Sequence, residues 1–336
     1  MSMPPEAIKA SPKQTHVARQ HKHGASLVSC RFDPTGKFVF YGAMDHGVWR
    51  WDLENDSVVK LDGHESWVRA IAFDEERRQV ITGGYDGRLI WWTAEGQLEQ
   101  IRVLSAHEGW IRSIAISPDQ QMLASAGNDL TVRLWSCEDG KLIQQFEGHE
   151  RHVYNVVFHP DGKHLATGDL MGNLYHWNVV AAKLERKFVV SPLHKYDTGF
   201  GADIGGFRDL RFNADGSLLG CAGITNVTNA FAGVGNPLVV IWDWDEGKQK
   251  TAYESKNKLR GVAWGVVFHP DGFTIGGSGG GGGGYLLFWN ADETQEFHQF
   301  KLPDTIRDLD MSPDRVQLVT AHHDGHIRIS RMTRKA

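Results

Sequence analysis

A phrase of about ten residues recurs seven times along this chain of 336 residues. The copies read LVSCRFDPTG, VRAIAFDEER, IRSIAISPDQ, VYNVVFHPDG, FRDLRFNADG, AWGVVFHPDG and IRDLDMSPDR, with anchor residues at Phe32, Phe73, Ile116, Phe158, Phe212, Phe268 and Met311. Successive anchors lie 41, 43, 42, 54, 56 and 43 residues apart. A period of about 40 to 45 residues is typical of a four-stranded propeller blade. Seven copies therefore predict seven blades.

Each copy predicts the inner hairpin of one blade. An apolar run ends at a turn such as Pro160-Asp161-Gly162, where proline presets φ and the following residues suit a tight reversal. A second strand, a third strand ending on an aromatic residue and a more polar fourth strand follow. The aromatic residue is Trp51, Trp92, Trp135, Trp177, Trp242 or Trp289. Inner strands are apolar on both faces because neighbouring blades enclose them, whereas outer strands carry charge.

These units resemble the repeats of the WD-repeat family, and the resemblance covers nearly the whole chain. In that family, a histidine, a serine or threonine, an aspartate and a tryptophan of one repeat form a hydrogen-bonded set. The second unit matches through His64, Thr82, Asp86 and Trp92, and the third through His107, Ser125, Asp129 and Trp135. The set is physically reasonable because a buried carboxylate needs donors, which imidazole, hydroxyl and indole groups supply.

Other units match the set only in part. The first has Tyr41 at the hydroxyl position, and the fourth has Met171 at the aspartate position. The seventh keeps Thr320 and Asp324 but has Ser330 in place of tryptophan and no preceding histidine. We expect those blades to be held by packing more than by this network.

The two ends of the chain predict how the ring closes. The last unit has no outer strand, because only four residues follow its third strand at 326–332. An unassigned strand at 15–20 precedes the first unit. Pairing this strand with the last blade removes the exposed edges of an open sheet. We therefore expect an all-β, seven-bladed propeller as a single domain over residues 14–333, after a disordered tail at 1–13.

Composition restricts the classes of function. The formal net charge of -5 provides no general basic field, which argues against binding to nucleic acid. Cys30, Cys137 and Cys221 are odd in number and lie in or beside strands, so reduced buried thiols are expected. No apolar run approaches the roughly 20 residues that span a bilayer, and the N-terminus lacks a signal-peptide core. We expect a cytoplasmic protein that is a monomer on its own and does not bind membranes.

Three possible chemical sites have simpler structural explanations. The histidines at 21–23 and 322–326 suggest a metal, but neighbours on a strand point to opposite faces, so we expect no metal site and no cofactor. The glycine run at 276–284 lacks the strand-to-helix context of a phosphate loop and predicts a flexible turn. No nucleophile motif is present, so no catalytic residue is assigned.

Insertions fall only in the fifth and sixth units, at 191–206, 223–237 and 276–284. In a four-stranded meander, the links from fourth to first strand and from second to third strand lie at one end, called here the top face. All three insertions lie at that end. Long loops on a rigid scaffold often carry recognition. Neutral insertion is the alternative, because surface loops tolerate added length at low cost.

The same top face should carry the partner-binding residues. The candidates are Trp67, Arg69, Tyr85, Trp110, Arg112, Asn128, His152, Tyr154, Arg208, Trp264 and Arg307. The WD-repeat resemblance implies partner contacts at these positions, and aromatic residues with arginine dominate binding hot spots. Four arginines around a central opening would attract an acidic or phosphorylated peptide. The alternative is that each arginine pairs with a neighbouring carboxylate such as Asp209 or Asp308.

These observations favour a noncatalytic scaffold that binds a partner protein or an acidic peptide on the top face. One alternative is an enzyme or small-ligand binder that uses the funnel near blades five and six, which the fold alone does not exclude. The other is a substrate receptor of a ubiquitin ligase, a role that the family resemblance implies. The Trp-Asp-x-Arg ending of one such group is absent, since the chain has Glu54 after Trp51-Asp52-Leu53 and Asp245 after Trp242-Asp243-Trp244.

Overall fold

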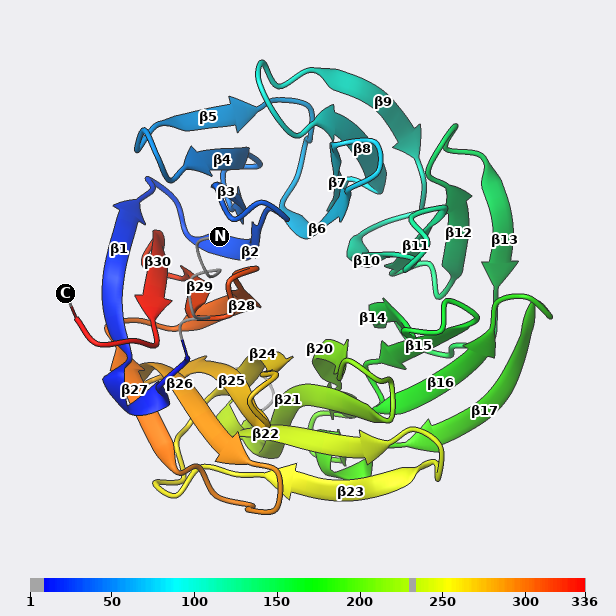
Figure 1. The fold of residues 1–336 in the computed structure, drawn as a ribbon. Helices are drawn as coiled ribbons and strands as arrows, with labels where there is room; N and C mark the ends of the chain where they lie inside the picture. The colour runs from blue at the N-terminus through cyan, green and yellow to red at the C-terminus, as the bar shows by residue number, and fades with distance from the viewer. Residues whose placement is uncertain (1–8, 230–233, 336) are drawn as a thin grey trace, which may run out of the picture.

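Seven antiparallel sheets of four strands form a closed ring in the computed structural model, which describes residues 9–229 and 234–335 (Figure 1). One strand of each sheet lies toward the centre of the ring, and the fourth strand lies on the outside. This arrangement confirms the predicted all-β, seven-bladed propeller. Among the described residues, no helix is long and apolar enough to cross a membrane.

Consecutive strands form the first four blades. The first comprises β2 (Leu27–Phe32), β3 (Phe38–Ala43), β4 (Val48–Asp52) and β5 (Val58–Leu61). The second comprises β6 (Val68–Asp74), β7 (Gln79–Gly84), β8 (Arg88–Thr93) and β9 (Gln100–Ser105). The third comprises β10 (Ile111–Ile116), β11 (Met122–Gly127), β12 (Val132–Ser136) and β13 (Leu142–Phe146). The fourth comprises β14 (Val153–Phe158), β15 (His164–Asp169), β16 (Asn173–Asn178) and β17 (Lys183–Val189).

The last three blades contain the insertions and the ring closure. The fifth comprises β20 (Phe207–Phe212), β21 (Leu218–Asn229), β22 (Val234–Asp243) and β23 (Lys248–Tyr253). The sixth comprises β24 (Val262–Phe268), β25 (Phe273–Gly280), β26 (Gly283–Asn290) and β27 (His298–Leu302). The seventh comprises β28 (Ile306–Met311), β29 (Gln317–His322), β30 (His326–Arg331) and the N-terminal β1 (His16–Lys22).

The N-terminal strand closes the ring as predicted. β1 runs antiparallel to β30, with His16 opposite Arg331 and Lys22 opposite His326. The apolar core continues across this junction, because Leu27 and Cys30 of blade one pack in one cluster with Ile329 of blade seven. Burial of a large apolar side chain contributes about 1.5–3 kcal/mol, so packing between neighbouring blades holds the ring together. Closure therefore rests on strand pairing and on the core.

The predicted disordered tail at 1–13 needs a correction at its C-terminal end. Residues 1–8 lie outside the described residues. Ala10 is buried in the core cluster of blades six and seven, and the Ser11 N–H donates to the Met332 carbonyl at 2.6 Å. A single 3-10 turn, η1 (Pro12–Gln14), then leads into β1. Apolar burial and this backbone hydrogen bond fix residues 10–13 against the last blade.

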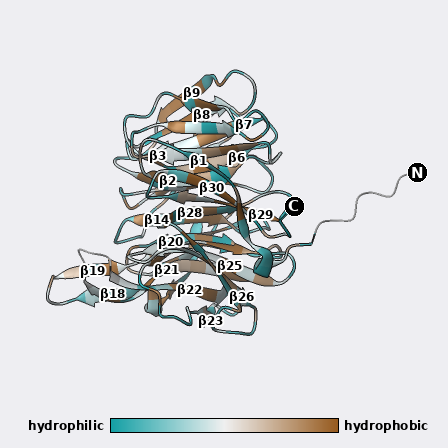
Figure 2. Ribbon diagram, turned by 90° about the vertical axis from the view of Figure 1, so that its left-hand side faces the viewer, coloured by the Kyte–Doolittle hydropathy of each residue, from teal (hydrophilic) through white to brown (hydrophobic). Residues whose placement is uncertain are grey.

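The insertions are mostly strands, although the sequence suggested loops. Before blade five, η2 (Ser191–Leu193) leads into a separate hairpin of β18 (His194–Asp197) and β19 (Ala202–Gly205). This hairpin protrudes from one face of the ring (Figure 2). Between the middle strands of blade five, β21 and β22 continue pairing past Thr225 and Asn236 and, after a register shift, as far as Asn229 and Val234. The insertion thus lengthens an existing hairpin, and its tip at 230–233 lies outside the described residues.

The glycine run is a flexible turn only at its centre. Gly280 pairs with Gly283 at the end of β25 and β26, which leaves two glycines for the turn. A Cβ atom added to Gly279 would lie 2.6 Å from the Ile306 backbone nitrogen, and one added to Gly284 would lie 2.3 Å from the Asp304 carbonyl oxygen. Glycine is therefore required because blade seven approaches this hairpin closely. The predicted flexible turn is in large part packed strand.

The three cysteines agree with their predicted role. Cys30, Cys137 and Cys221 are buried and form no disulfide. Burial raises the pKa of the Cys137 thiol to about 12 and that of the other two above their usual range. All three are inert core residues.

Candidate functional site

A β-bulge interrupts the innermost strand of every blade at the same position. The register between first and second strand shifts at Val28, Arg69, Arg112, Tyr154, Arg208, Trp264 and Arg307. A bulge leaves one residue unpaired and re-aims its side chain. The seven bulges thus present one side chain from each blade at the same end of the ring.

These seven side chains line one hollow of about 170 Å3, which we call the central pocket. Met44, Trp67, Tyr85 and Phe207 complete its wall. Met44 and Tyr85 belong to turns between second and third strands. Trp67 lies in the link that enters the first strand of blade two, and Phe207 is the first residue of the first strand of blade five. Both kinds of link therefore meet at one end of the ring, as expected for the top face.

The four arginines of the pocket lie against aromatic rings. The Arg112 guanidinium carbon lies 4.4 Å from the centroid of the Tyr154 ring, and Arg208 lies 5.2 Å from the same ring. Arg69 and Arg307 each lie 5.2 Å from the Trp264 ring, and Arg208 lies 5.5 Å from it. Cation–π contacts of this kind contribute about 0.5–2 kcal/mol and fix the planes of the guanidinium groups. The pocket is therefore preorganised.

None of these arginines forms an ion pair with a carboxylate within the described part of the chain. Arg69 donates to the Val28 carbonyl at 3.1 Å, and Arg208 donates to the Gly205 carbonyl at 3.0 Å. Arg112 donates from Nε to the Asn128 side-chain oxygen at 2.8 Å. Among the described residues, the Arg307 guanidinium has no hydrogen-bond acceptor, and its Nε is buried.

The alternative interpretation, that Asp209 or Asp308 pairs with these arginines, is wrong. Asp308 accepts from Arg31 at 2.7 Å, and Asp209 accepts from the Val266 N–H at 3.0 Å. These carboxylates line a smaller hollow of about 40 Å3 together with Arg31. Arg69, Arg112 and Arg208 of the central pocket also border this hollow. Arg31 thus occupies Asp308, and none of the four pocket arginines forms an ion pair among the described residues.

Burial and neighbouring charges lower the pKa values of two of the pocket arginines. Burial lowers the pKa of Arg208 to about 10; Tyr154 opposes this change, whereas the charges of Arg69 and Arg112 add to it. Burial also lowers the pKa of Arg307; the charge of Arg69 adds to that effect, whereas Asp304 and Tyr85 oppose it. Like charges held together in a partly desolvated site favour the entry of an anion.

Three aromatic residues form a rim on the side of the pocket near blades two and three. The aromatic rim consists of Trp67, Tyr85 and Trp110. Tyr85 and Trp110 stack with ring centroids 4.3 Å apart, and Trp67 lies 6.0 Å from Tyr85. Trp110 is 42% exposed, which is unusual for so large an apolar side chain. The rim offers a flat, partly apolar surface to a partner.

The structure brings together most of the predicted partner-binding residues. Trp67, Arg69, Tyr85, Arg112, Tyr154, Arg208, Trp264 and Arg307 line the central pocket. Trp110 and Asn128 lie outside its wall but contact Arg112. His152 is exposed and does not line the pocket. The sequence analysis missed Val28, Met44 and Phe207, although Val28 occupies the same position in its repeat as Arg69 does.

The hydrogen-bonded sets of blades two and three form as the family resemblance implies. His64 contacts Asp86 at 3.0 Å and Thr82 at 2.8 Å. His107 contacts Asp129 at 2.9 Å and Ser125 at 2.6 Å. Trp92 and Trp135 donate to Thr82 and Ser125 at 2.9 and 2.8 Å. These sets fix the turns that carry Tyr85 and Asn128.

Blade four has the complete set, contrary to expectation. Asp169 replaces the missing aspartate, since its carboxylate contacts His149 at 2.9 Å. Thr167 contacts His149 at 2.7 Å and accepts from Trp177 at 2.8 Å. The prediction failed because Asp169 precedes Met171 by two residues but still reaches the same histidine from the end of β15.

Blade seven replaces its missing histidine in a similar way. His322, on the same strand as Thr320, contacts the Thr320 hydroxyl at 2.8 Å and the Asp304 carbonyl at 2.8 Å. Arg328 donates to Asp324 at 2.7 Å. In blade one, His23 contacts Asp45 at 2.8 Å, whereas the buried Tyr41 hydroxyl has no described partner. Polar networks thus support blade seven, and the expectation of packing alone fits blade one better.

A second hollow lies near the insertion of blade five. It measures about 430 Å3 and is lined by Ser191, Pro192, His194, Lys195, Ile204, Ile224, Thr225, Asn226, Val227 and Thr228. Lys195 donates to the Val227 carbonyl at 3.3 Å, and His194 contacts Asp203 at 3.0 Å. Lys195 and His194 are thus each engaged in a contact within the described residues.

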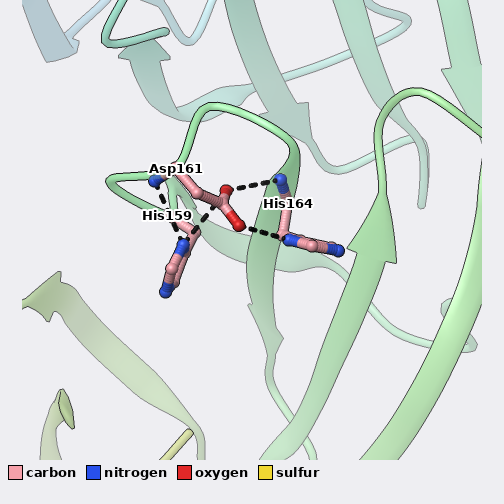
Figure 3. Close-up of side chains that lie close together, drawn as sticks. All are labelled: His159, Asp161 and His164. Atoms are coloured by element: carbon pink, nitrogen blue, oxygen red, sulfur yellow. Dashed lines mark hydrogen bonds and ion pairs between the residues drawn. The ribbon is translucent and has the colours of Figure 1, made fainter. Parts of the chain in front are cut away.

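Two histidines flank Asp161 in blade four (Figure 3). The Asp161 carboxylate contacts His164 at 2.7 Å and His159 at 3.0 Å. His159 also contacts the Gly216 carbonyl through Nε2 at 3.2 Å and accepts the Asp161 N–H at Nδ1. Both nitrogens of His159 are thus engaged, and His269 repeats this pattern with the Arg315 carbonyl in blade six. The pattern belongs to the His-Pro-Asp-Gly turn and not to a metal site.

His164, His176 and Glu185 form a second cluster on the same blade. Nε2 of His164 and Nε2 of His176 lie 3.6 and 3.5 Å from the Glu185 carboxylate. Nδ1 of His176 accepts a hydrogen bond from Arg186 at 2.9 Å, so the neutral ring carries its proton on Nε2. A metal-bound imidazole needs the reverse arrangement. The contact with Arg186 therefore disfavours a metal here.

Comparison with known sequences identifies the repeat. The family model for the WD domain, G-beta repeat, matches residues 55–93, 98–136, 140–178 and 294–329. These segments lie in blades one to four and in blades six and seven. Together with the seven four-stranded blades and the hydrogen-bonded sets, this match shows that the chain belongs to the WD-repeat family.

Relatives match at low identity and over part of their length. Pre-mRNA-processing factor 17 of Homo sapiens is 24% identical over 311 residues, which cover 80% of this chain and 51% of that protein. Transcription initiation factor TFIID subunit 5 of Caenorhabditis elegans is 24% identical over 170 residues, 51% of this chain and 26% of that protein. DDB1- and CUL4-associated factor 10 of Danio rerio is 46% identical over 44 residues, 12% of this chain and 9% of that protein. The chain thus spans about half the length of the first relative and less of the others.

Proposed function

We propose that this protein is a noncatalytic scaffold that binds a partner protein, or an acidic peptide segment of it, on its top face. The observation that carries the proposal is the set of seven bulges. Each blade directs one side chain into the central pocket, and four of these side chains are arginines without a described ion pair.

The aromatic rim supports the same proposal. Tryptophan, tyrosine and arginine are the residue types enriched in binding hot spots. Trp110 is partly exposed and Arg112 lies 4.8 Å from its ring, so a partner would bury both together. Two relatives are named as a subunit of a transcription factor and as a factor associated with other proteins, which agrees with a protein partner.

The test is partner capture from native lysate by the Trp110→Ala/Arg112→Ala double variant. We expect capture of the partner to fall at least tenfold while the ring stays folded, because both side chains face solvent at least in part. The matched control is Leu142→Ala/Arg102→Ala on the outer strands, which should capture as the wild type does. Unchanged capture by the top-face variant contradicts the proposal.

A substrate receptor of a ubiquitin ligase is the second candidate. The observation that favours it is the 46% identity over 44 residues with DDB1- and CUL4-associated factor 10. Glu54 and Asp245 stand where the Trp-Asp-x-Arg ending of one receptor group has arginine. Binding of purified DDB1 to the purified chain would support this candidate, and no binding would reject it.

The remaining expectations stay predictions. We expect a monomer, and sedimentation at micromolar concentration would check this. The predicted cytoplasmic location is checked by fractionating cells and comparing nuclear and cytoplasmic pools.

A further inference from the structure

We propose that the central pocket binds a single phosphate group on a phosphorylated side chain of the partner protein, so that phosphorylation controls partner capture. This inference rests on the proposed function, because it names the chemistry that the top face recognises. It commits to phosphate over carboxylate, and to a protein side chain over a free metabolite or a lipid.

The charge of the pocket exceeds what a carboxylate would balance. Four guanidinium groups reach it from blades two, three, five and seven. No described carboxylate pairs with any of them, although the chain as a whole carries a formal net charge of -5. A phosphate monoester carries about -1.5 to -2 charge at pH 7 and presents three acceptor oxygens. A carboxylate carries a single charge and two oxygens in one plane.

The geometry also fits a tetrahedral group. Donors approach from several directions around the ring, because each bulge lies on a different blade. Arg69 and Arg307 lie against one ring, Trp264, while Arg112 and Arg208 lie against another, Tyr154. Two pairs of guanidinium groups can therefore contact different oxygens of one phosphate, as arginine forks do in phosphate sites.

The pocket is large enough for a phosphate group but not for a whole small molecule. Its volume of about 170 Å3 is below the roughly 300–1,000 Å3 of sites that enclose drug-sized ligands. A nucleotide would therefore leave most of its atoms outside. The remaining contacts must come from the surface around the opening.

That surface suits a polypeptide. Trp67, Tyr85 and Trp110 form a continuous aromatic row beside the pocket, with Tyr85 within 6.0 Å of Trp67 and 4.3 Å of Trp110. Val28 and Met44 of blade one add an apolar wall within the pocket. An extended segment with one phosphorylated residue and apolar neighbours would place the phosphate among the arginines and its neighbours on these surfaces.

The first experiment measures fluorescence anisotropy with labelled degenerate peptide pools. The pools share their flanking positions and carry phosphoserine, serine or glutamate at one fixed position. We expect the phosphoserine pool to bind at least tenfold more tightly than either other pool. Equal binding of the glutamate and phosphoserine pools would overturn the commitment to phosphate.

Variants locate the binding in the pocket. Arg208→Gln and Arg307→Gln should each weaken binding of the phosphoserine pool at least tenfold. Arg102→Gln is the matched control, because Arg102 lies 5.3 Å from the Trp91 ring outside the pocket. Circular dichroism confirms that each variant is folded, and Arg307→Lys offers a milder change if either glutamine variant unfolds. Tight binding that survives in folded pocket variants contradicts the proposal.

Two further arms distinguish the source of the phosphate. Vesicles that contain phosphoinositides, and inorganic phosphate as a competitor, should each compete with the phosphoserine pool at least tenfold less well than an unlabelled phosphoserine pool does. Competition equal to that of the pool would overturn the assignment to a protein side chain.

Phosphatase treatment of the lysate separates this inference from the proposed function. We expect treated lysate to yield at least tenfold less captured partner. If capture is unchanged by phosphatase but is lost in the Trp110→Ala/Arg112→Ala variant, the phosphate inference fails and the scaffold proposal stands. If capture is unchanged in that variant as well, both fail.

Discussion

Tyr85 and Trp110 stack with their planes 2° from parallel, although they belong to different blades. Tyr85 lies in the turn between β7 and β8, and Trp110 lies in the link that enters β10. Arg112 lies 5.3 Å from the Tyr85 ring and 4.8 Å from the Trp110 ring. The top of blades two and three is therefore one preformed surface before any partner binds.

This contact predicts a measurable coupling between the two rings. In a double-mutant cycle of Tyr85→Leu and Trp110→Leu, urea unfolding should give a coupling free energy of about 0.5–1.5 kcal/mol, as stacked aromatic pairs do. The control cycle pairs Trp110→Leu with Tyr196→Leu on the blade-five hairpin and should give no coupling. Additive free energies in the Tyr85 cycle would show that the stack is not preformed.

Ring closure predicts that the N-terminal strand stabilises the whole molecule. Removal of residues before His21 deletes most of β1, and β30 then becomes an exposed edge. We expect the free energy of unfolding to fall by at least about 3 kcal/mol, because several backbone hydrogen bonds are lost together. The reference is a shorter truncation that retains Ala10 onward. A long truncation that melts at the wild-type temperature would contradict closure by β1.

The replacement of the family aspartate in blade four is also testable. Asp169 is fully buried and contacts His149, so Asp169→Asn should lower the free energy of unfolding by about 2 kcal/mol or more. Met171→Leu, at the usual aspartate position, should change it by less than about 0.5 kcal/mol. Chemical denaturation of both variants provides the comparison. Equal stability of Asp169→Asn and the wild type would refute the replacement.

A buried histidine predicts sensitivity to acid. Burial lowers the pKa of His176 to about 4, and the Arg186 charge adds to this effect. Between pH 6.5 and 4 the unfolded chain therefore binds a proton at this residue that the folded chain does not. Stability must fall as the pH drops through this window. From pH 7.5 to pH 5, His176 should account for about 2 kcal/mol of lost stability.

The measurement compares urea unfolding of His176→Gln and the wild type at pH 7.5 and pH 5. Glutamine can still accept a hydrogen bond from Arg186 but has no titrating group. We expect the loss of stability on acidification to be smaller in the variant by about 2 kcal/mol. His323→Gln is the control, since His323 is exposed and lies in another blade. An identical loss in His176→Gln and the wild type would show that this histidine is not buried in its neutral form.

The architecture was predictable because each copy of the repeat corresponds to one four-stranded blade. Seven anchors that lie 41 to 56 residues apart define the blades, and the polar sets of blades two and three follow from the positions of His64 and His107. The pairing of β1 with β30 followed from counting strands at the two ends. The residues of one repeat are close together in the sequence, so patterns within a repeat can be recognised without the structure.

Residues that replace members of a set from displaced positions, and contacts between repeats, were not predictable. Asp169 and His322 replace missing members of the sets from displaced positions, and only the folded backbone shows that their side chains reach the same partners. The absence of an ion pair between Asp308 and a pocket arginine could not be predicted, because only the structure shows that Asp308 pairs with Arg31. The packing of Gly279 and Gly284 against blade seven was hidden within a run that suggests flexibility.

The central claim, that the partner binds the top face, is tested most directly by site-specific photocrosslinking in native cells. A photoreactive phenylalanine analogue is placed at Trp110 on the aromatic rim, or at Ile143 on the exposed outer strand β13. The account predicts a crosslinked partner from position 110 and none from position 143. A partner captured from position 143 but not from position 110 would contradict it.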